Sequence, residues 1–300
     1  MPNCLLCKSN RVHLYTIKKI IYSYYLCYDC YTVFLYPSPS LNKINSLYKN
    51  NFDYSSGKTE EKRIRNRARS ILKKLKRLNP EGQTLLDIGS GYGFFLDEAY
   101  RTGLKVTGVE PSSINRFKKN TVVRNNFQNY YLKYPSKKYD FIVLIHVIEH
   151  LFNPESDLKK AYSLLNDGGV LYLETPNLSG WLFKAEGKDY TFLTPPDHIW
   201  IFSLKSLMLL TSRLNGIKDI LINTYSYPEH FIGIIRRFIN RKKVNSLKIN
   251  PRNNKIEQRN PLQKQIKLII FDRFLATLFF RLIDIGHKGT FLGLYIRKKR

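Results

Sequence analysis

The sequence predicts a doubly wound, mainly parallel α/β domain preceded by a small cysteine-rich module. Short apolar segments alternate with helical segments through the middle of the chain, which is the pattern of consecutive βαβ units. All four cysteines fall within the first 30 residues, ahead of that alternation. With 300 residues, 43% of them hydrophobic, the chain can fill one large core and carry a small appendage.

The cysteine-rich module contains two C-x-x-C pairs, Cys4 with Cys7 and Cys27 with Cys30, separated by nineteen residues. This spacing is typical of a zinc ribbon, in which each pair presents two thiolates from one tight turn. Disulfides and redox chemistry are the alternatives, and a reducing compartment disfavours the disulfides. We expect Cys4, Cys7, Cys27 and Cys30 to hold one structural zinc ion, with no open position for catalysis.

Proline and glycine mark the expected boundaries. The segment YPSPS at 36–40 ends the ribbon, and NPEG at 79–82 ends a basic, helical stretch. We therefore expect a zinc ribbon at 1–40, a basic helical lead-in at 41–80 and the main domain at 81–300.

Apolar runs and capping residues predict the elements of the main domain. The expected strands are 84–88, 105–109, 139–145, 170–174, 217–225 and 291–296. The expected helices are 94–101, one that begins after Asn153 with Pro154 in its first turn and ends at 167–169, and one from Ser203 to 215–216.

A basic, asparagine-rich and then amphipathic helical insertion is expected at about 228–290. We expect its apolar face to pack on the core, and peripheral membrane contact through 262–300 stays open as the alternative. Charged residues interrupt the segment 266–285, so no transmembrane segment is expected. The first ten residues do not resemble a secretory signal, so the expected location is cytoplasmic, or peripheral to the membrane.

A glycine-rich turn, DIGSGYG at 87–93, lies between the first strand and the first helix of the main domain. Glycine lets the backbone approach a ligand closely and adopt unusual dihedral angles. The second strand is followed by Glu110, where an acid can accept hydrogen bonds from the hydroxyls of a ribose. The acid argues against a tight turn that binds nothing.

Four blocks between about Thr84 and Gly216 resemble class I S-adenosylmethionine-dependent methyltransferases. LLDIGSGYGFFLDEAYRTGLKVTGVEPS is similar to motif I and the acid of the second strand, and YDFIVLIHVIEHLFNP, LLNDGGVLYLETPN and PPDHIWIFSLKSL are similar to later blocks of the ubiquinone-biosynthesis-like branch. A zinc knuckle before such a domain resembles a bacterial subgroup often linked to polysaccharide or antibiotic-sugar biosynthesis. The resemblance implies a seven-stranded Rossmann-like sheet.

The resemblance also implies a set of cofactor-binding residues. Asp87, Gly89 and Gly91 would line the methionine half of S-adenosylmethionine, and Glu110 would hold its ribose. Pro111 would lie near the adenine, and His146 would face the cofactor through its backbone. Ser90 and Gly93 complete the expected set. Asn126 and Phe127 stand where an adenine-contacting acid is often found, which leaves that contact in doubt.

A sulfonium is an activated methyl donor, so an acid or base is needed only when the acceptor carries a proton. His198 and His150 are the candidate bases, because histidine titrates near working pH. His150 could instead cap or orient its loop. Glu149, His150 and Asp197 could also gather around a divalent ion, although their spacing alone does not predict one. The aromatic and proline-rich stretch 181–196 suits a lid or an acceptor pocket.

We expect methyl transfer to a small or carrier-linked acceptor such as a sugar, a glycan precursor or a related metabolite. A net charge of +27 and the zinc ribbon keep an RNA methyltransferase as the alternative, but the N-P-P-aromatic block typical of base methylation is missing. A binding protein without activity is the third hypothesis, which the intact residues of the turn and Glu110 argue against.

Overall fold

The computed structural model describes residues 1–19, 21–40, 44, 55–117, 119, 121–227, 284 and 286–300. Most of the expected insertion at 228–290, with its amphipathic segment, therefore lies outside the described residues. Within them, no helix is both long and apolar enough to cross a bilayer.

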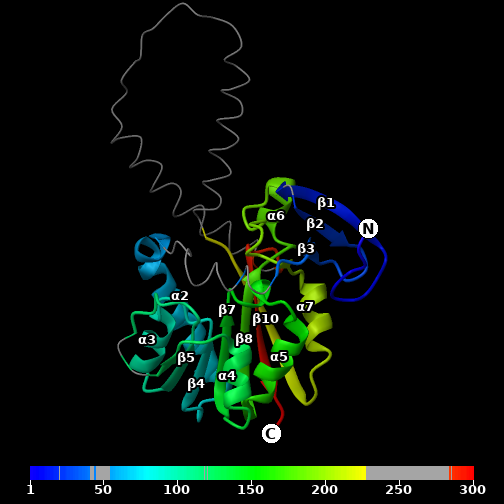
Figure 1. Ribbon diagram of the computed structural model, residues 1–300. Helices are drawn as coiled ribbons and strands as arrows, with labels where there is room; N and C mark the ends of the chain where they lie inside the picture. The colour runs from blue at the N-terminus through cyan, green and yellow to red at the C-terminus, as the bar shows by residue number, and fades with distance from the viewer. Residues whose placement is uncertain are drawn as a thin grey trace, which may run out of the picture.

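The described part of the main domain is built on a sheet of seven strands (Figure 1). The strands are β4 (Thr84–Ile88), β5 (Lys105–Val109), β6 (Val122–Val123), β7 (Tyr139–Ile145), β8 (Leu165–Pro176), β10 (Ile217–Tyr225) and β11 (Phe291–Lys298). Their order is β10-β11-β8-β7-β4-β5-β6. The five adjacent strands β8, β7, β4, β5 and β6 are parallel, while β11 runs antiparallel to β8 and β10. The predicted doubly wound, mainly parallel sheet is confirmed.

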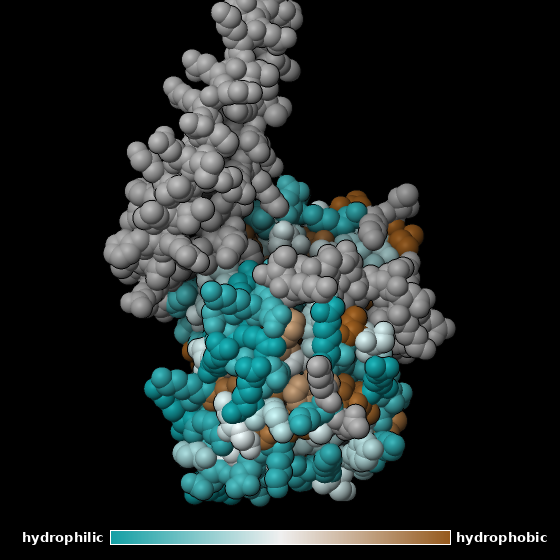
Figure 2. All heavy atoms as spheres, turned by 90° about the vertical axis from the view of Figure 1, so that its left-hand side faces the viewer, coloured by the Kyte–Doolittle hydropathy of each residue, from teal (hydrophilic) through white to brown (hydrophobic). Residues whose placement is uncertain are grey.

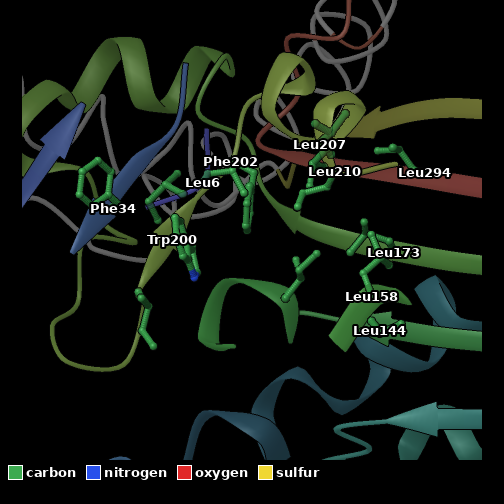
Figure 3. Close-up of a cluster of buried hydrophobic side chains, with 14 of the residues drawn as sticks. Leu6, Phe34, Leu144, Leu158, Leu173, Trp200, Phe202, Leu207, Leu210 and Leu294 are labelled. Atoms are coloured by element: carbon green, nitrogen blue, oxygen red, sulfur yellow. The ribbon is translucent and has the colours of Figure 1, made fainter. Parts of the chain in front are cut away.

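Helices cover both faces of this sheet. They are α2 (Ser55–Leu78), α3 (Phe94–Arg101), α4 (Phe127–Lys133), α5 (Pro154–Ser163) and α7 (Leu204–Thr211). Successive strand residues point to opposite faces. In β4, Leu85 belongs to the core beneath α2 and α3, whereas Leu86 belongs to the core beneath α4, α5 and α7. Figure 3 shows this second core, where Leu144 and Leu173 of the sheet lie near Leu158 of α5.

Most element boundaries agree with the sequence prediction. Strands β8 and β11 are longer than the predicted 170–174 and 291–296, and two helices end earlier than predicted. Helix α5 ends at Ser163, so the residues 167–169 lie in β8 and do not end the helix. The reason is tertiary, because the Gly168 N–H donates to the Lys299 carbonyl just after β11. Helix α7 ends at Thr211, a few residues before the predicted end. Strand β6 and helix α4, which Asn126 caps, were not predicted.

The cysteine-rich module forms a second sheet that extends into the main domain. Its strands β1 (Val12–Lys19), β2 (Tyr22–Cys27) and β3 (Val33–Tyr36) are antiparallel neighbours. Strand β9 (Trp200–Ile201) of the main domain adds to the free edge of β3. The two modules therefore share backbone hydrogen bonds.

The stretch 181–196, expected as a lid or pocket wall, is packed more tightly than that expectation implies. It contains α6 (Trp181–Glu186) and the 3₁₀ turn η2 (Gly187–Asp189). Leu182, Tyr190 and Leu193 are buried, and Phe183 stacks on Tyr15 of β1.

Candidate functional site

The four cysteines converge at one end of the ribbon. Cys4 Sγ lies 3.6 Å from Cys30 Sγ, and Cys7 Sγ lies 3.6 Å from Cys27 Sγ. All four sulfur atoms lie within 4.8 Å of one another. A zinc ion with Zn–S bonds of about 2.3 Å needs sulfur atoms about 3.8 Å apart in a tetrahedron. The donor set and its dimensions therefore fit zinc.

Each cysteine pair has the backbone of a metal-binding turn. Lys8 and Tyr31, the residues that follow the two pairs, have φ angles of 65° and 54°. Left-handed backbone is unfavourable for such side chains. In both turns it directs an N–H onto the carbonyl of the first cysteine, from Lys8 to Cys4 at 2.9 Å and from Tyr31 to Cys27 at 3.1 Å. Both cysteine turns therefore have the same strained backbone geometry.

The glycine turn at the carboxyl end of β4 is open at one residue. Gly89, Gly91 and Gly93 all have positive φ. A Cβ on Gly89 would collide with Val147, and one on Gly93 would lie 2.8 Å from Phe117 Cβ. A Cβ on Gly91 would meet no atom of the described residues within 4 Å. Gly91 is therefore the point where the backbone faces unfilled space, and the other two glycines are required by the protein's own packing.

Asp87 is a buried carboxylate at the start of this turn. Its Oδ2 atom has no hydrogen-bond partner among the described residues, and the residue is 2% exposed. Burial, together with the charge of Glu110, raises the pKa of Asp87 to about 8. An unpaired buried acid is costly, so the site suits a ligand that brings a positive charge.

Glu110 lies across the turn from the residues just described, at the end of β5. Its Oε2 accepts a hydrogen bond from Gly91 N at 2.8 Å, and its Oε1 accepts from Ser112 N at 2.9 Å and Ser112 Oγ at 2.7 Å. Asn115 Nδ2 donates to the Gly91 carbonyl at 2.8 Å. The carboxylate therefore faces the glycine turn, where ribose hydroxyls could share it. Ser112 and Asn115 were missed in the sequence because their roles depend on how the loop folds back.

The other expected cofactor residues surround the same edge of the sheet. Ser90 is buried and accepts from Asn115 Nδ2, while Pro111 is exposed. The His146 N–H donates to the Glu174 carbonyl, and its φ is 55°. The His146 ring lies between two acids, 3.4 Å from Glu149 and 3.6 Å from Glu174. Burial lowers the pKa of His146, but these carboxylates outweigh it and the pKa is raised.

The two candidate bases are brought together. The ring centroids of His150 and His198 lie 4.7 Å apart. His150 Nδ1 lies 3.0 Å from Asp197 Oδ1, and the charge of Asp197 outweighs burial and raises the pKa of His150 to about 9. His198 Nδ1 lies 2.6 Å from the Phe192 carbonyl, which requires a proton on that nitrogen. Burial and the charge of His150 lower the pKa of His198 to about 4. At neutral pH, His150 is thus charged and His198 is neutral, with the lone pair on Nε2, which lies 3.8 Å from Asp197 Oδ2.

Buried polar groups with few hydrogen bonds lie beside this pair. Among the described residues, neither carboxylate oxygen of Glu149 has a hydrogen-bond partner, although His146 Nδ1 lies 3.4 Å from Oε1, and the hydroxyl of buried Tyr190 has none. Ligand atoms of Glu149, His150 and His198 lie within 4.8 Å of one another, so these three could hold a cation. The set differs from the Glu149, His150 and Asp197 considered in the sequence, because Asp197 pairs with His150.

Another buried acid near the site was not predicted from the sequence. Glu174, 1% exposed, lies near the carboxyl end of β8 and accepts from Arg67 of α2 at 2.7 Å and from Tyr225 at 2.6 Å. The Tyr172 hydroxyl also donates to it. An isolated acid in an apolar strand was the available signal, but its cationic partner lies 107 residues away.

Comparisons with known proteins identify the family and the fold of the main domain. Residues 61–215 match a family described as a methyltransferase domain. A ubiquinone biosynthesis O-methyltransferase of Proteus mirabilis is 26% identical over 121 residues, which is 36% of this chain and 49% of the relative. The chain thus spans about half the length of the curated relatives that it matches.

Solved structures share the fold. A SAM-dependent methyltransferase from Archaeoglobus fulgidus is 20% identical, with a TM-score of 0.54, and covers 82% of this chain and 100% of its own. The plantazolicin methyltransferase BamL, in complex with a triazolic desmethylPZN analog and SAH, is 16% identical with a TM-score of 0.51. It covers 86% of this chain and 96% of its own.

Proposed function

Because this chain belongs to the methyltransferase domain family, we propose that it transfers a methyl group from S-adenosylmethionine to a small or carrier-linked acceptor. The observation that carries the proposal is the open backbone at Gly91 between two buried acids, Asp87 and Glu110. S-adenosylmethionine brings a positive sulfonium and ammonium together with a ribose diol. Asp87 is suited to the positive charge, and Glu110 to the hydroxyls.

On the acceptor side, we assign His198 the part of proton acceptor. The Phe192 carbonyl fixes the proton of His198 on Nδ1, which leaves Nε2 to receive a hydrogen bond from an acceptor hydroxyl. His150, charged and paired with Asp197, orients this neighbour and adds positive charge beside the developing anion. Buried Tyr190 helps to keep water away.

The ion pairs of the described helix α2 support a small or peptide acceptor over RNA. Its arginines at 65, 67 and 69 pair with acids of the same chain, which leaves less of the positive charge of the helix for phosphates. The names of the relatives point the same way, since one acts in ubiquinone biosynthesis and the plantazolicin enzyme is complexed with a desmethylPZN analog. A sugar or glycan precursor, a related metabolite or a modified peptide is therefore preferred over RNA.

We also propose that the four cysteines hold a structural zinc ion. When bound, zinc would crosslink the two cysteine turns, and four thiolates would leave it no position for substrate. Metal analysis of the purified chain should give about one zinc per chain. A metal-free, fully folded ribbon in reduced protein would contradict this.

The cofactor proposal is tested by two glycine variants. Gly91→Ala adds a methyl group where the methionine half of the cofactor is expected, so calorimetry should show at least tenfold weaker binding of S-adenosylhomocysteine. The left-handed backbone adds a strain of about 1–2 kcal/mol. Gly89→Ala is the control for loss of stability. Its Cβ would collide with Val147, so it should lower the free energy of unfolding more than Gly91→Ala does. Wild-type affinity in Gly91→Ala would sink the proposed cofactor site.

The acceptor proposal is tested with a radiolabelled methyl donor. Phenols, nucleotide sugars, a short thiazole peptide and total RNA are each incubated with the enzyme. We expect label in one of the small or peptide acceptors and its loss in His198→Gln, in which binding of S-adenosylhomocysteine is unchanged. Label that appears in RNA alone would replace the small-acceptor proposal with RNA methylation.

A further inference from the structure

The ribbon and the acceptor-side loop are joined by backbone pairing at the loop itself. Strand β9 begins two residues after His198, and it pairs with β3 through Val33 opposite Ile201 and Phe34 opposite Trp200. Figure 3 shows Phe34 and Trp200 close together between the two modules. The fourth strand of the ribbon sheet therefore belongs to the chain segment that carries His198.

Three further hydrogen bonds run from the ribbon into this segment. The Tyr24 hydroxyl donates to the His198 carbonyl at 2.7 Å, and Leu35 N donates to the Ile199 carbonyl at 2.8 Å. Thr32 Oγ1 donates to the Ile201 carbonyl at 3.1 Å. Tyr24 and Thr32 are fully buried, so these bonds do not compete with water.

The opposite side of the same segment is bound to the turn that carries Glu149 and His150, η1 (Ile148–His150). Ile199 N donates to the Glu149 carbonyl at 2.9 Å, and Trp200 Nε1 donates to the Leu151 carbonyl at 2.8 Å. Residues 198–201 thus lie between the ribbon on one side and η1 on the other. A shift of the ribbon would be transmitted to both histidines.

The cysteines hold the part of the ribbon that makes these contacts. Cys27 ends β2 three residues after Tyr24, and its N–H donates to the Thr32 carbonyl at 3.0 Å. Cys30 lies two residues before Thr32. A metal bound by both cysteines would add a crosslink to the β2–β3 turn, whereas the free thiols add only weak sulfur contacts to the backbone bonds of Cys27.

We propose that the metal-bound ribbon positions the acceptor half of the active site, with Tyr24 as its positioning residue. The catalytic role of His198 in this inference rests on the proposed function. The coupling of the ribbon to residues 198–201 does not depend on it. Metal loss loosens residues 198–201 and leaves the glycine turn that binds the cofactor intact. The ribbon then helps to position the active site and does not only stabilise the fold.

The two tryptophans of the chain provide the first test. The Trp200 indole N–H donates to Leu151 beside η1, and the Trp181 indole N–H donates to Ser226 Oγ after β10. In the full chain, we expect chelation to speed hydrogen exchange of the Trp200 indole at least tenfold and added Zn²⁺ to restore it. Exchange at Trp181 and calorimetric binding of S-adenosylhomocysteine should change less than twofold.

Two outcomes of the chelation test would overturn the inference. One is a Trp200 indole that exchanges at the same rate with and without metal. The other is a joint loss of both tryptophan signals and of S-adenosylhomocysteine binding, which would mean that the metal supports the whole fold. If S-adenosylhomocysteine fails to bind even the zinc-loaded chain, the proposed function fails, while the Trp200 response still reports on the ribbon.

A pair of tyrosine variants tests Tyr24 in the zinc-loaded protein, where folding is not in question. Tyr24→Phe removes only the hydroxyl bonded to His198, so the ring signal of His198 in ¹³C-histidine spectra should move and Trp200 exchange should rise at least threefold. Tyr25→Phe, on the other face of β2, is the matched control and should change neither. Equal spectra for the two variants would refute the positioning role.

Discussion

Two aspartates at opposite ends of neighbouring strands have opposite environments. Asp87, at the carboxyl end of β4, has a buried oxygen without a partner, and its pKa is raised to about 8. Asp140, at the amino end of β7, accepts hydrogen bonds from Gln83 N at 2.8 Å and Thr84 N at 2.9 Å. Although burial raises the pKa of Asp140, these bonds outweigh it and the pKa is lowered. Asp87 is therefore available to a ligand, whereas Asp140 stabilises the start of β4 and β7 through its hydrogen bonds.

Replacing Asp87 should therefore stabilise the protein while it weakens cofactor binding. The folded pKa of Asp87 exceeds the unfolded value of 3.8, so the folded chain holds the extra proton and loses stability as pH rises from about 4 to 8. Asp87→Asn removes that loss. At pH 9 it should raise the free energy of unfolding by about 2–5 kcal/mol, with little effect at pH 4. Denaturant unfolding at both pH values measures this, and calorimetry should show at least tenfold weaker S-adenosylhomocysteine binding.

Asp140→Asn is the control with the reverse sign. Its folded pKa is depressed, so its contribution is present above pH 3.8 and is lost as pH falls through the folded pKa. This variant should destabilise the chain at pH 7 and leave the cofactor affinity unchanged. A stabilisation by Asp87→Asn that does not grow with pH would contradict the account of Asp87.

At the scale of elements, helix α2 shows how part of the charge of a basic segment can be paired within its own fold. Arg65 bonds to Asp97 and Glu98 of α3, and Arg69 bonds to Glu98 at 2.7 Å. Arg67 reaches past the helix surface to Glu174, and its guanidinium lies 3.7 Å from the centre of the Tyr225 ring. The sequence predicted a basic helix here, but not that its arginines clamp α2 to the sheet and to α3.

The Arg67–Glu174 pair is buried, so removing one partner should be costly. Arg67→Met keeps the aliphatic stem but leaves the Glu174 charge buried, which should lower the free energy of unfolding by about 3–5 kcal/mol. Arg77→Met, in the exposed last turn of the same helix, should change it by less than about 0.5 kcal/mol. Urea unfolding compares the two, and similar losses would show that the pair is not what anchors α2.

At the scale of the molecule, the ribbon and the main domain share a sheet and a core. Residues of β2 and β3 belong to the same buried cluster as β7, β8 and α7. Figure 2 shows a mostly hydrophilic surface on the α2 and α3 side, in keeping with a formal charge of +27. The contact between the modules is thus made of buried apolar groups, backbone bonds and the buried hydroxyls of Tyr24 and Thr32.

Such continuity predicts cooperative unfolding. The zinc-loaded chain should unfold in one calorimetric transition with equal van't Hoff and calorimetric enthalpies. Chelation should lower the transition temperature, because a metal bound only to the folded state stabilises it. Two separate transitions in the zinc-loaded protein would show that ribbon and main domain fold independently.

The sequence by itself determined the features that arise from neighbours along the chain. Strands 84–88, 105–109 and 217–225 and helix 94–101 have the predicted bounds, because apolar runs, glycines and caps act over a few residues. The cysteine pairs and the glycine turn were also local patterns. Their roles toward zinc and S-adenosylmethionine stay proposals.

Tertiary structure alone decided what depends on distant partners. The Tyr24 bond to His198 spans 174 residues, and the Arg67 bond to Glu174 spans 107. The charge states of His150 and His198 follow from Asp197, Phe192 and burial once the chain is folded. Burial and electrostatic contact depend on which segments meet in space, and neither partner's local sequence specifies that meeting.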